Sequence, residues 1–471
     1  MTITRTRPPG TVPATPGAGG LPDAARSRAL GLPSATALVI GSIIGTGVFS
    51  MPGVLAGAGT SSILVLAVIS VGALLLGVLF GQLTKRIPNH DGGLYAYARH
   101  EFGDFAGYLT AWCYWITAVA GNAAIVSSWV FYVESLFGIH NPSAWTNFAI
   151  AALGLWIPAA VNLAGAKQMA WAQNLTVVLK FVPLLFVAVV GWFFVKSANF
   201  GPFNATGGSL YSAIGIAAGV ALFSFIGVEC AAIAAARVRD PGRNVGRASV
   251  FGTALSAGLY LLVSVAVMGL VAHPKLDGNG APFVDAVQAM FNGAGWAGKA
   301  VALVAVVSGI GALNGWTLVT AEVPWAAARD GLFLPQFAKT YRDGTAWFGI
   351  LVSTLMSTLL MAFAYSSNTG LTVFTYLVNL SVVTVAIPYF FSACAQLTYL
   401  ASGRRRVHGW TMARDLSIAG ASVLFSLWVT MASGYQSVYQ ALFLLLLGIP
   451  IYAFLQARRE ARGEVAAPVD A

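Results

Sequence analysis

The 471-residue sequence has few charged residues, few cysteines and no cluster of histidines, and each shortage excludes a class of protein. Charged residues make up 9% of the chain, whereas about a quarter is typical of soluble domains. The three cysteines lie within apolar runs, so they form neither a disulfide framework nor a metal-ligand spacing. The five histidines lie in loops or at the ends of apolar runs. We therefore expect no enzyme, no metal site and no cofactor.

Apolar residues are abundant instead, at 57% of the chain with a mean hydropathy of +0.76. Apolar runs of spanning length recur from end to end, which predicts an all-α polytopic membrane protein. We expect twelve transmembrane helices, at residues 35–57, 61–83, 106–137, 145–165, 173–195, 212–236, 249–271, 298–323, 346–365, 371–399, 415–433 and 436–456.

The basic residues support this count, because lysine and arginine accumulate in cytoplasmic loops. With the N-terminus inside, the outer segments hold only Lys196, Lys275 and Lys299, and Lys180 lies within a span. The net charge of +10 is spread between spans rather than gathered with aromatic residues, so no nucleic-acid site is expected. The sequence thus predicts a multi-pass protein of the cell membrane, in contact with the lipid bilayer, with both termini cytoplasmic.

The first 33 residues are rich in proline, glycine and arginine and have no apolar core of the kind found in a secretory signal. They are expected to form a disordered cytoplasmic tail. The remaining organisation is predicted as a transport core at 34–400, two peripheral transmembrane helices at 401–457 and a cytoplasmic tail at 458–471.

The first predicted span contains the segment Gly-Ser-Ile-Ile-Gly-Thr-Gly-Val-Phe, at residues 41–49. Glycine-rich backbone at membrane depth is tolerated where its freed N–H and C=O groups line a cavity. The alternative is a packing face, since small residues let helices approach closely. The sixth span repeats the feature with Phe-Ser-Phe-Ile-Gly-Val-Glu at residues 223–229, five spans later.

Two broken helices in corresponding places, the first and the sixth, predict a five-plus-five inverted repeat with its binding site at the midplane. The N-terminus of the half-helix near Gly45 and Gly47 suits a carboxylate, and unwound carbonyls from Phe223 to Ile226 suit an ammonium group. The site should therefore accept a zwitterion.

Polar and aromatic groups in the middle of other spans are candidates for contacting the rest of the ligand. Asn122 lies near the centre of the third span, Trp316 lies past the centre of the eighth, and Tyr114 is a further candidate. An aromatic face in a dry cavity attracts cations. The alternatives are an interhelical hydrogen bond for Asn122 and the interfacial belt for tryptophan.

Lys180 and Glu229 are ionisable groups within the fifth and sixth spans. Each is penalised by about 3 kcal/mol on insertion scales. They could form a structural ion pair with each other. Either could also act as a proton carrier or pH sensor.

Five motifs in order resemble those of the amino acid–polyamine–organocation superfamily. They are the segments at 41–49 and 223–229 together with Gly-Gly-Leu-Tyr-Ala-Tyr-Ala-Arg at 92–99, Asp-Pro-Gly-Arg-Asn-Val at 240–245 and Asn-Gly-Trp-Thr-Leu at 314–318. Within the superfamily the chain is most similar to basic amino acid/polyamine antiporters of the arginine/agmatine type. The resemblance implies ten core helices in an inverted repeat, two peripheral helices and alternating access.

The resemblance also implies roles for individual residues. It assigns the substrate carboxylate to Thr46 and Gly47 and coupling or pH sensing to Lys180 and Glu229. The α-amine is expected on carbonyls of Ile43, Phe223 and Ile226, and a distal cation near Asn122 and Trp316. The full set of candidate substrate-binding residues is Ser42, Ile43, Gly45, Thr46, Gly47, Tyr114, Thr117, Ala118, Asn122, Phe223, Ser224, Ile226 and Trp316.

Two residues depart from the antiporter pattern. Phe223 stands where the antiporter has a tryptophan that closes over the substrate. Lys180 resembles the lysine that occupies the place of a sodium ion in sodium-independent members. We therefore expect a sodium-independent carrier of cationic amino acids such as arginine or their decarboxylation products. Proton-coupled uptake of neutral amino acids is the alternative, and a channel or receptor is the alternative from another class. The oligomeric state, including a homodimer, is left open.

Overall fold

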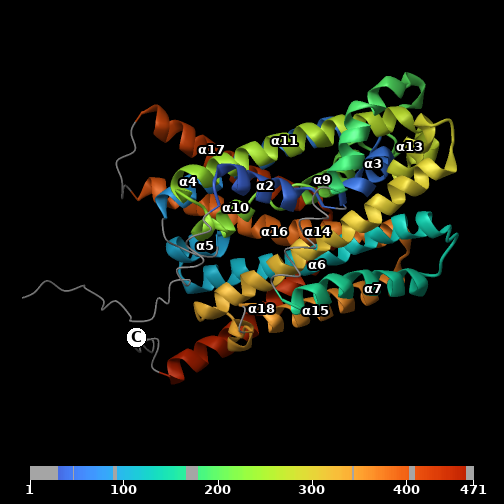
Figure 1. The fold of residues 1–471 in the computed structure, drawn as a ribbon. Coiled ribbons are helices and arrows are strands. Elements are labelled where there is room, and N and C mark those ends of the chain that lie inside the picture. Colours follow the sequence, from blue (N-terminus) through green and yellow to red (C-terminus); the bar gives the residue numbers. More distant parts are fainter. Residues whose placement is uncertain are drawn as a thin grey trace, which may run out of the picture.

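The computed structural model describes residues 30–45, 47–87, 93–165, 179–341, 344–402 and 409–462. The elements in these segments are all helices, and they run roughly along one common direction (Figure 1). An isolated parallel bridge joins Leu30 to Val238. The prediction of an all-helical protein is confirmed.

Nine helices in the described segments are long and apolar enough to cross a membrane. They are α4 (Ser61–Arg86), α6 (Asp104–Phe137), α7 (Ala144–Leu163), α11 (Pro241–Leu270), α14 (Gly295–Arg329), α15 (Trp347–Ser367), α16 (Gly370–Ala401), α17 (Trp410–Ala432) and α18 (Tyr435–Ala461). The pair α2 (Leu32–Ile43) and α3 (Gly47–Ala58) forms a tenth candidate, bent by 49° at its break. The predicted break in the first span is thus present.

Two shorter apolar helices, Leu179–Val189 and α9 (Leu210–Phe223), lie in the same bundle. Turns follow α9 until α10 begins (Cys230–Ile233), and α10 leads into the 3₁₀ helix η3 (Ala235–Arg237). Shorter elements connect the long helices: α5 (Leu94–Phe102), η1 (Gly191–Phe194), η2 (Ser197–Asn199), α12 (His273–Leu276), α13 (Pro282–Met290) and η4 (Pro335–Ala338).

Helix α6 lies at the centre of the bundle, and its apolar part is buried along its whole length. It packs against α14, α16 and α7. On another side of the bundle, α4 crosses α11 closely because both helices present glycine at the crossing. A Cβ added at Gly81 would lie 2.3 Å from the Cα of Gly246. Small residues allow this approach and so bring the two backbones into contact.

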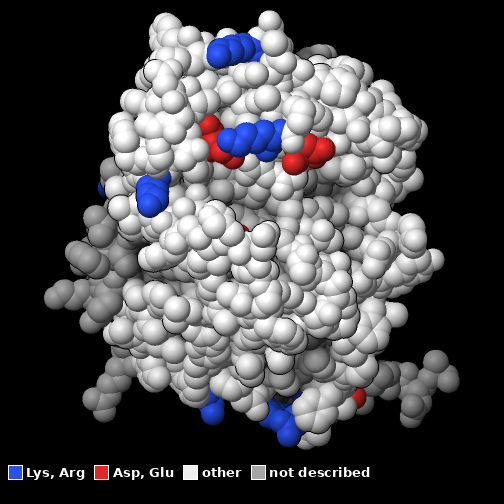
Figure 2. Space-filling view, turned by 90° about the vertical axis from the view of Figure 1, so that its right-hand side faces the viewer, with Lys and Arg blue, Asp and Glu red and all other residues white. Residues whose placement is uncertain are grey.

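The two ends of the bundle differ in charge. We call one end the basic end, because it carries Lys85 and Arg86 at the close of α4, Arg243 and Arg247 at the start of α11, Arg329 at the close of α14, Arg414 in α17, and Arg458 and Arg459 at the close of α18. The opposite end, where α13 lies, shows only scattered charged side chains (Figure 2). This asymmetry is what the positive-inside rule leads one to expect of a membrane protein.

The α4–α11 crossing can be tested with the smallest added group. Gly81→Ala should lower the stability of the purified protein by about 1–3 kcal/mol, because the new methyl group meets backbone that cannot move aside. The melting temperature in detergent measures this loss. Gly258→Ala on α11 is the matched control, since an added Cβ there meets nothing within 4 Å. Equal melting temperatures for the two variants would contradict the close crossing.

Candidate functional site

The break in the first span separates the C-terminal end of α2 from the N-terminal end of α3. The last carbonyls of one helix and the first N–H groups of the next have no partner within a helix. Both sets lie in the middle of the bundle, near Gly45 and Gly47. Thr46, predicted to bind a carboxylate, lies outside the described residues.

The ammonium group of Lys180 binds two carbonyls at this break, one in the last turn of α2 and one on the residue that follows it. Its Nζ donates to the carbonyl of Gly41 at 2.6 Å and to that of Ile44 at 2.9 Å. The residue is only 2% exposed. A cation is well suited to this position, because the C-terminal end of a helix carries partial negative charge.

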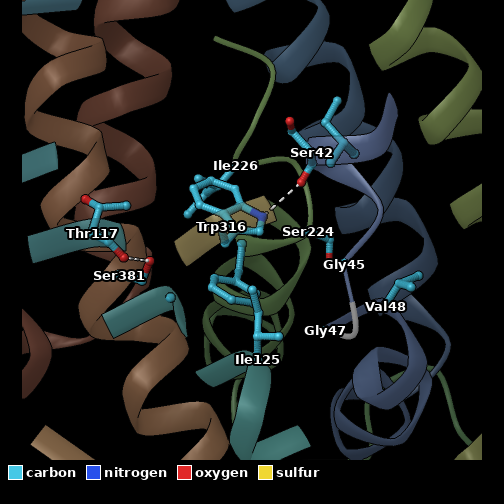
Figure 3. A pocket seen from close by; sticks show the side chains of 13 residues that line it. Ser42, Gly45, Gly47, Val48, Thr117, Ile125, Ser224, Ile226, Trp316 and Ser381 are labelled. Carbon is cyan, nitrogen blue, oxygen red and sulfur yellow. Dashed lines mark hydrogen bonds between the residues drawn. The ribbon is translucent and has the colours of Figure 1, made fainter. Parts of the chain in front are cut away.

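The carbonyls of Ser42 and Ile43, which lie along the chain between those of Gly41 and Ile44, also accept hydrogen bonds from side chains. The hydroxyl of Tyr260, on α11, donates to the carbonyl of Ile43 at 2.9 Å. The indole Nε1 of Trp316, on α14, donates to the carbonyl of Ser42 at 3.2 Å (Figure 3). Side chains from three helices therefore meet at one helix end.

The second interruption, between α9 and α10, packs directly on the first. Gly227 has a φ of +122°, a conformation that favours glycine. A Cβ at this position would also lie 2.8 Å from the carbonyl carbon of Ser42. The turn after α9 therefore needs glycine for its own conformation and for its contact with α2.

The side chain of Glu229 is hydrogen-bonded to the backbone of this turn. Its carboxylate accepts hydrogen bonds from the Gly227 N–H at 3.1 and 3.2 Å, from the Tyr114 hydroxyl at 2.7 Å and from the Tyr389 hydroxyl at 2.7 Å. The residue is fully buried. Within the described chain no ion pair joins it to Lys180, and the two groups have separate sets of partners.

A small cavity of about 20 Å³ lies between the two interruptions. Trp316 lines it and lies in the middle of Figure 3, with Gly45 and Gly47 on one side. The ring of Phe223 covers Gly47, since a Cβ there would lie 2.9 Å from its Cε1. A cavity of this size holds about one water molecule. An amino acid can enter only if side chains such as Phe223 or Trp316 move.

Most of the predicted substrate-binding residues meet at this cavity. Its lining includes the predicted residues Ser42, Ile43, Gly45, Gly47, Thr117, Phe223, Ser224, Ile226 and Trp316. Tyr114 lies away from it against Glu229, and Ala118 is buried without lining it. Asn122 donates from Nδ2 to the Thr320 hydroxyl at 3.0 Å, and its buried Oδ1 has no partner among the described residues.

Other residues of the site carry little or no signal in the sequence and were not predicted. Val48, Gly121, Ile125 and Ser381 also line the cavity. Ser381, on α16, donates to the carbonyl of Thr117 at 3.0 Å (Figure 3). Of these, Val48 and Gly121 had a signal, since Val48 lies within the segment 41–49 and Gly121 directly precedes Asn122. Tyr260 and Tyr389 were also missed, because an aromatic residue within an apolar run resembles ordinary core.

The arrangement suits binding rather than bond cleavage. It offers helix N–H groups at α3, carbonyls at the turn after α9 and an indole face, which together suit a ligand with a carboxylate and an ammonium group. No group of three metal-ligating side chains occurs in the part of the chain that the structure describes.

Comparison with known proteins agrees with this geometry. The model of the amino acid permease family matches residues 30–453. The chain is 31% identical to an arginine/ornithine antiporter of Pseudomonas aeruginosa, over 94% of this chain and 93% of that protein. It is 30% identical to a putative arginine/ornithine antiporter of Bacillus subtilis, over 89% of this chain and 95% of that protein. It is 29% identical to the putrescine transporter PotE of Haemophilus influenzae, over 92% of this chain and 98% of that protein.

These matches run along nearly the whole chain, and they confirm the resemblance carried by the five sequence motifs. They also agree with the expectation of a transporter rather than an enzyme. The chain belongs to the amino acid permease family of the amino acid–polyamine–organocation superfamily, and it is a multi-pass membrane transporter of amino acids.

Proposed function

We propose that this permease carries cationic amino acids such as arginine or ornithine, or their decarboxylation products, by alternating access without sodium. The observation that carries the proposal is that Thr320 links Trp316, which lines the cavity, to Asn122, which lies behind this lining. The Thr320 hydroxyl donates to the backbone carbonyl of Trp316 at 2.6 Å. The same hydroxyl accepts a hydrogen bond from the side-chain amide of Asn122. The free Oδ1 of Asn122 suits a cationic N–H donor, and the indole face suits its charge.

The substrate backbone would lie across the two breaks. Its carboxylate would meet the N–H groups at the start of α3, once the ring of Phe223 moves away from Gly47. Its α-amine would meet the carbonyls of Ile43, Phe223 and Ile226. The carbonyl of Ile43 already accepts from the Tyr260 hydroxyl and from the Gly45 N–H, each at 2.9 Å, so the amine would take the place of one of these donors.

The finer architecture is part of the proposal. We infer twelve spans in a five-plus-five inverted repeat, with both termini cytoplasmic. Each predicted span overlaps a described helix or helix pair, because Leu179–Val189 and α9 fall in the fifth and sixth predicted spans. The division into tails, a core at 34–400 and two peripheral helices at 401–457 follows the same count.

Proton-coupled uptake of neutral amino acids is the second candidate function. Two observations favour it. Phe223 offers a weaker face for a cation than an indole would. Lys180 occupies the helix end at which a coupling ion would otherwise bind.

The choice between these substrates depends on Trp316. Trp316→Leu should weaken arginine binding by about 1–2 kcal/mol, the scale of a desolvated cation–π contact, while alanine binding changes little. Competition of unlabelled amino acids against labelled arginine in proteoliposomes measures both affinities. Trp316→Phe is the matched control, because it keeps a ring but loses the bond to Ser42. Equal losses for arginine and alanine in Trp316→Leu would assign the indole to packing or gating.

Lys180 should make transport independent of sodium, since its ammonium group already pairs with the carbonyls of Gly41 and Ile44. Replacing sodium with choline should leave uptake unchanged. Lys180→Ala should slow turnover about tenfold or more, because two buried carbonyls lose their donor. Lys180→Arg, which keeps the charge, is the control. A steep fall of parental uptake in choline would exclude this mechanism.

Glu229 should contribute to the pH dependence of transport. The groups facing it are the hydroxyls of Tyr114 on α6 and Tyr389 on α16 and the backbone N–H of Gly227, so no cation among the described residues fixes its charge. Glu229→Gln keeps the shape and removes the exchangeable proton. Its uptake rate should therefore vary less between about pH 5 and 8, with substrate still bound. An unchanged pH profile would make Glu229 a structural cap for the turn.

A further inference from the structure

A second, larger cavity lies at the basic end of the bundle. It has a volume of about 720 Å³ and is formed by the end of α4, the start of α11, the end of α16 and the start of α17. The closely packed backbones of Gly81 and Gly246 form part of its wall. Nothing in the proposed transport cycle uses this cavity, and it shares no lining residue with the central one.

The cavity carries an excess of positive charge. One carboxylate, that of Asp415, is surrounded by basic residues, which are Lys85, Arg86, Arg243, Arg247 and Arg414. Asp415 is already saturated: it pairs with Arg86, with Arg414 at 2.9 Å and with the side-chain amide of Gln82 at 2.9 Å. It therefore has little capacity to neutralise further cations.

Several of the basic groups have hydrogen-bonding capacity to spare. Lys85, Arg243 and Arg247 are exposed, and none of them takes part in an ion pair in the described segments. The Nη1 atom of Arg86 is buried without a hydrogen-bond partner among the described residues. Such a cluster, in which donors outnumber the one carboxylate beside them, suits an anion with several oxygens.

Part of the cavity wall is apolar, formed by Val78, Val250, Phe251 and Ile418, and this part continues onto the outer surface of the bundle. Phe251 of α11 lines the cavity and is 52% exposed, and Leu255 and Leu262 follow on the same helix, at 62% and 47% exposed. The distance along the helix from Phe251 to Leu262 is about 16 Å, close to the roughly 15 Å depth of one leaflet's hydrocarbon. An apolar path therefore leads from the charged cavity towards the bilayer centre.

We propose that this cavity binds an anionic phospholipid, with its phosphate held by Lys85, Arg243 and Arg247 and an acyl chain along the exposed face of α11. Basic pockets between transmembrane helices are suited to lipid headgroups. A soluble phosphate compound would use the charges, but it would leave the apolar face of the cavity and of α11 uncovered. A phospholipid would both pair with the charges and cover the apolar face. The proposal is independent of which substrate the permease carries.

The test is binding of phosphatidylglycerol to the delipidated full-length protein in detergent, followed by native mass spectrometry. We expect saturable binding that is at least tenfold tighter than that of zwitterionic phosphatidylcholine. Arg243→Ala/Arg247→Ala should weaken phosphatidylglycerol binding about 30-fold, since each basic residue near an anionic lipid contributes about a factor of five. Lys85→Gln alone should weaken it about fivefold on the same basis, and this variant serves as the test if the double variant does not fold.

The matched control is Arg239→Ala/Lys339→Ala, which removes the same charge from exposed positions that do not line the cavity. It should bind phosphatidylglycerol as the parent does. Equal weakening in both double variants, or equal affinity for the two lipids, would overturn the proposal. If glycerol phosphate, which has no acyl chain, stabilises the protein against heat as well as phosphatidylglycerol does, the occupant is a soluble phosphate and the lipid assignment is wrong.

Discussion

The structure of the site depends on the carbonyl groups at the end of α2 that have no hydrogen-bond partner within the helix. A backbone carbonyl without a partner costs several kcal/mol in a dry interior. Four consecutive carbonyls, from Gly41 to Ile44, each receive a side-chain donor, from Lys180, Tyr260 or Trp316. These donors come from three helices that are far apart in the sequence. The break is therefore stable only when the whole bundle is assembled around it, and the same assembly creates the cavity.

The two interrupted helices are held together near both ends of α2. Gly227 packs on the backbone of Ser42 in the middle of the bundle. At the far end of α2, the N–H of Leu30 donates to the carbonyl of Arg237 at 2.6 Å, and the N–H of Arg239 donates to the carbonyl of Leu30 at 2.9 Å. A displacement of α2 alone would break these bonds and this contact. Movement at the site is thus expected to carry α2 and α10 together.

The sequence predicts the features that depend on one segment of chain. Hydropathy predicts the spanning helices, and the glycines at 41–47 predict where the first span breaks, because both signals are local. The partners of buried groups depend on which faces of distant helices meet. Lys180 and Glu229 could have formed an ion pair by sequence, yet each has its own partners in the structure. Tyr389 could not be singled out from the sequence, because a buried tyrosine has no local pattern that separates it from core.

The use of a lysine at the end of α2 constrains how transport can be driven. A bound metal ion can dissociate into the cytoplasm and so couple its own gradient to the movement of the helices. The Lys180 ammonium group is covalently attached, so the carbonyls of Gly41 and Ile44 keep a cation in every cycle. In the proposed sodium-independent mechanism, the free energy for uphill transport enters through a proton or through a counter-substrate in the cavity. Glu229 is a buried carboxylate in the turn between α9 and α10, whose residues Ser224 and Ile226 line that cavity, and Trp316 lines it from α14. A proton would therefore act through Glu229, and a cationic counter-substrate would bind at Trp316.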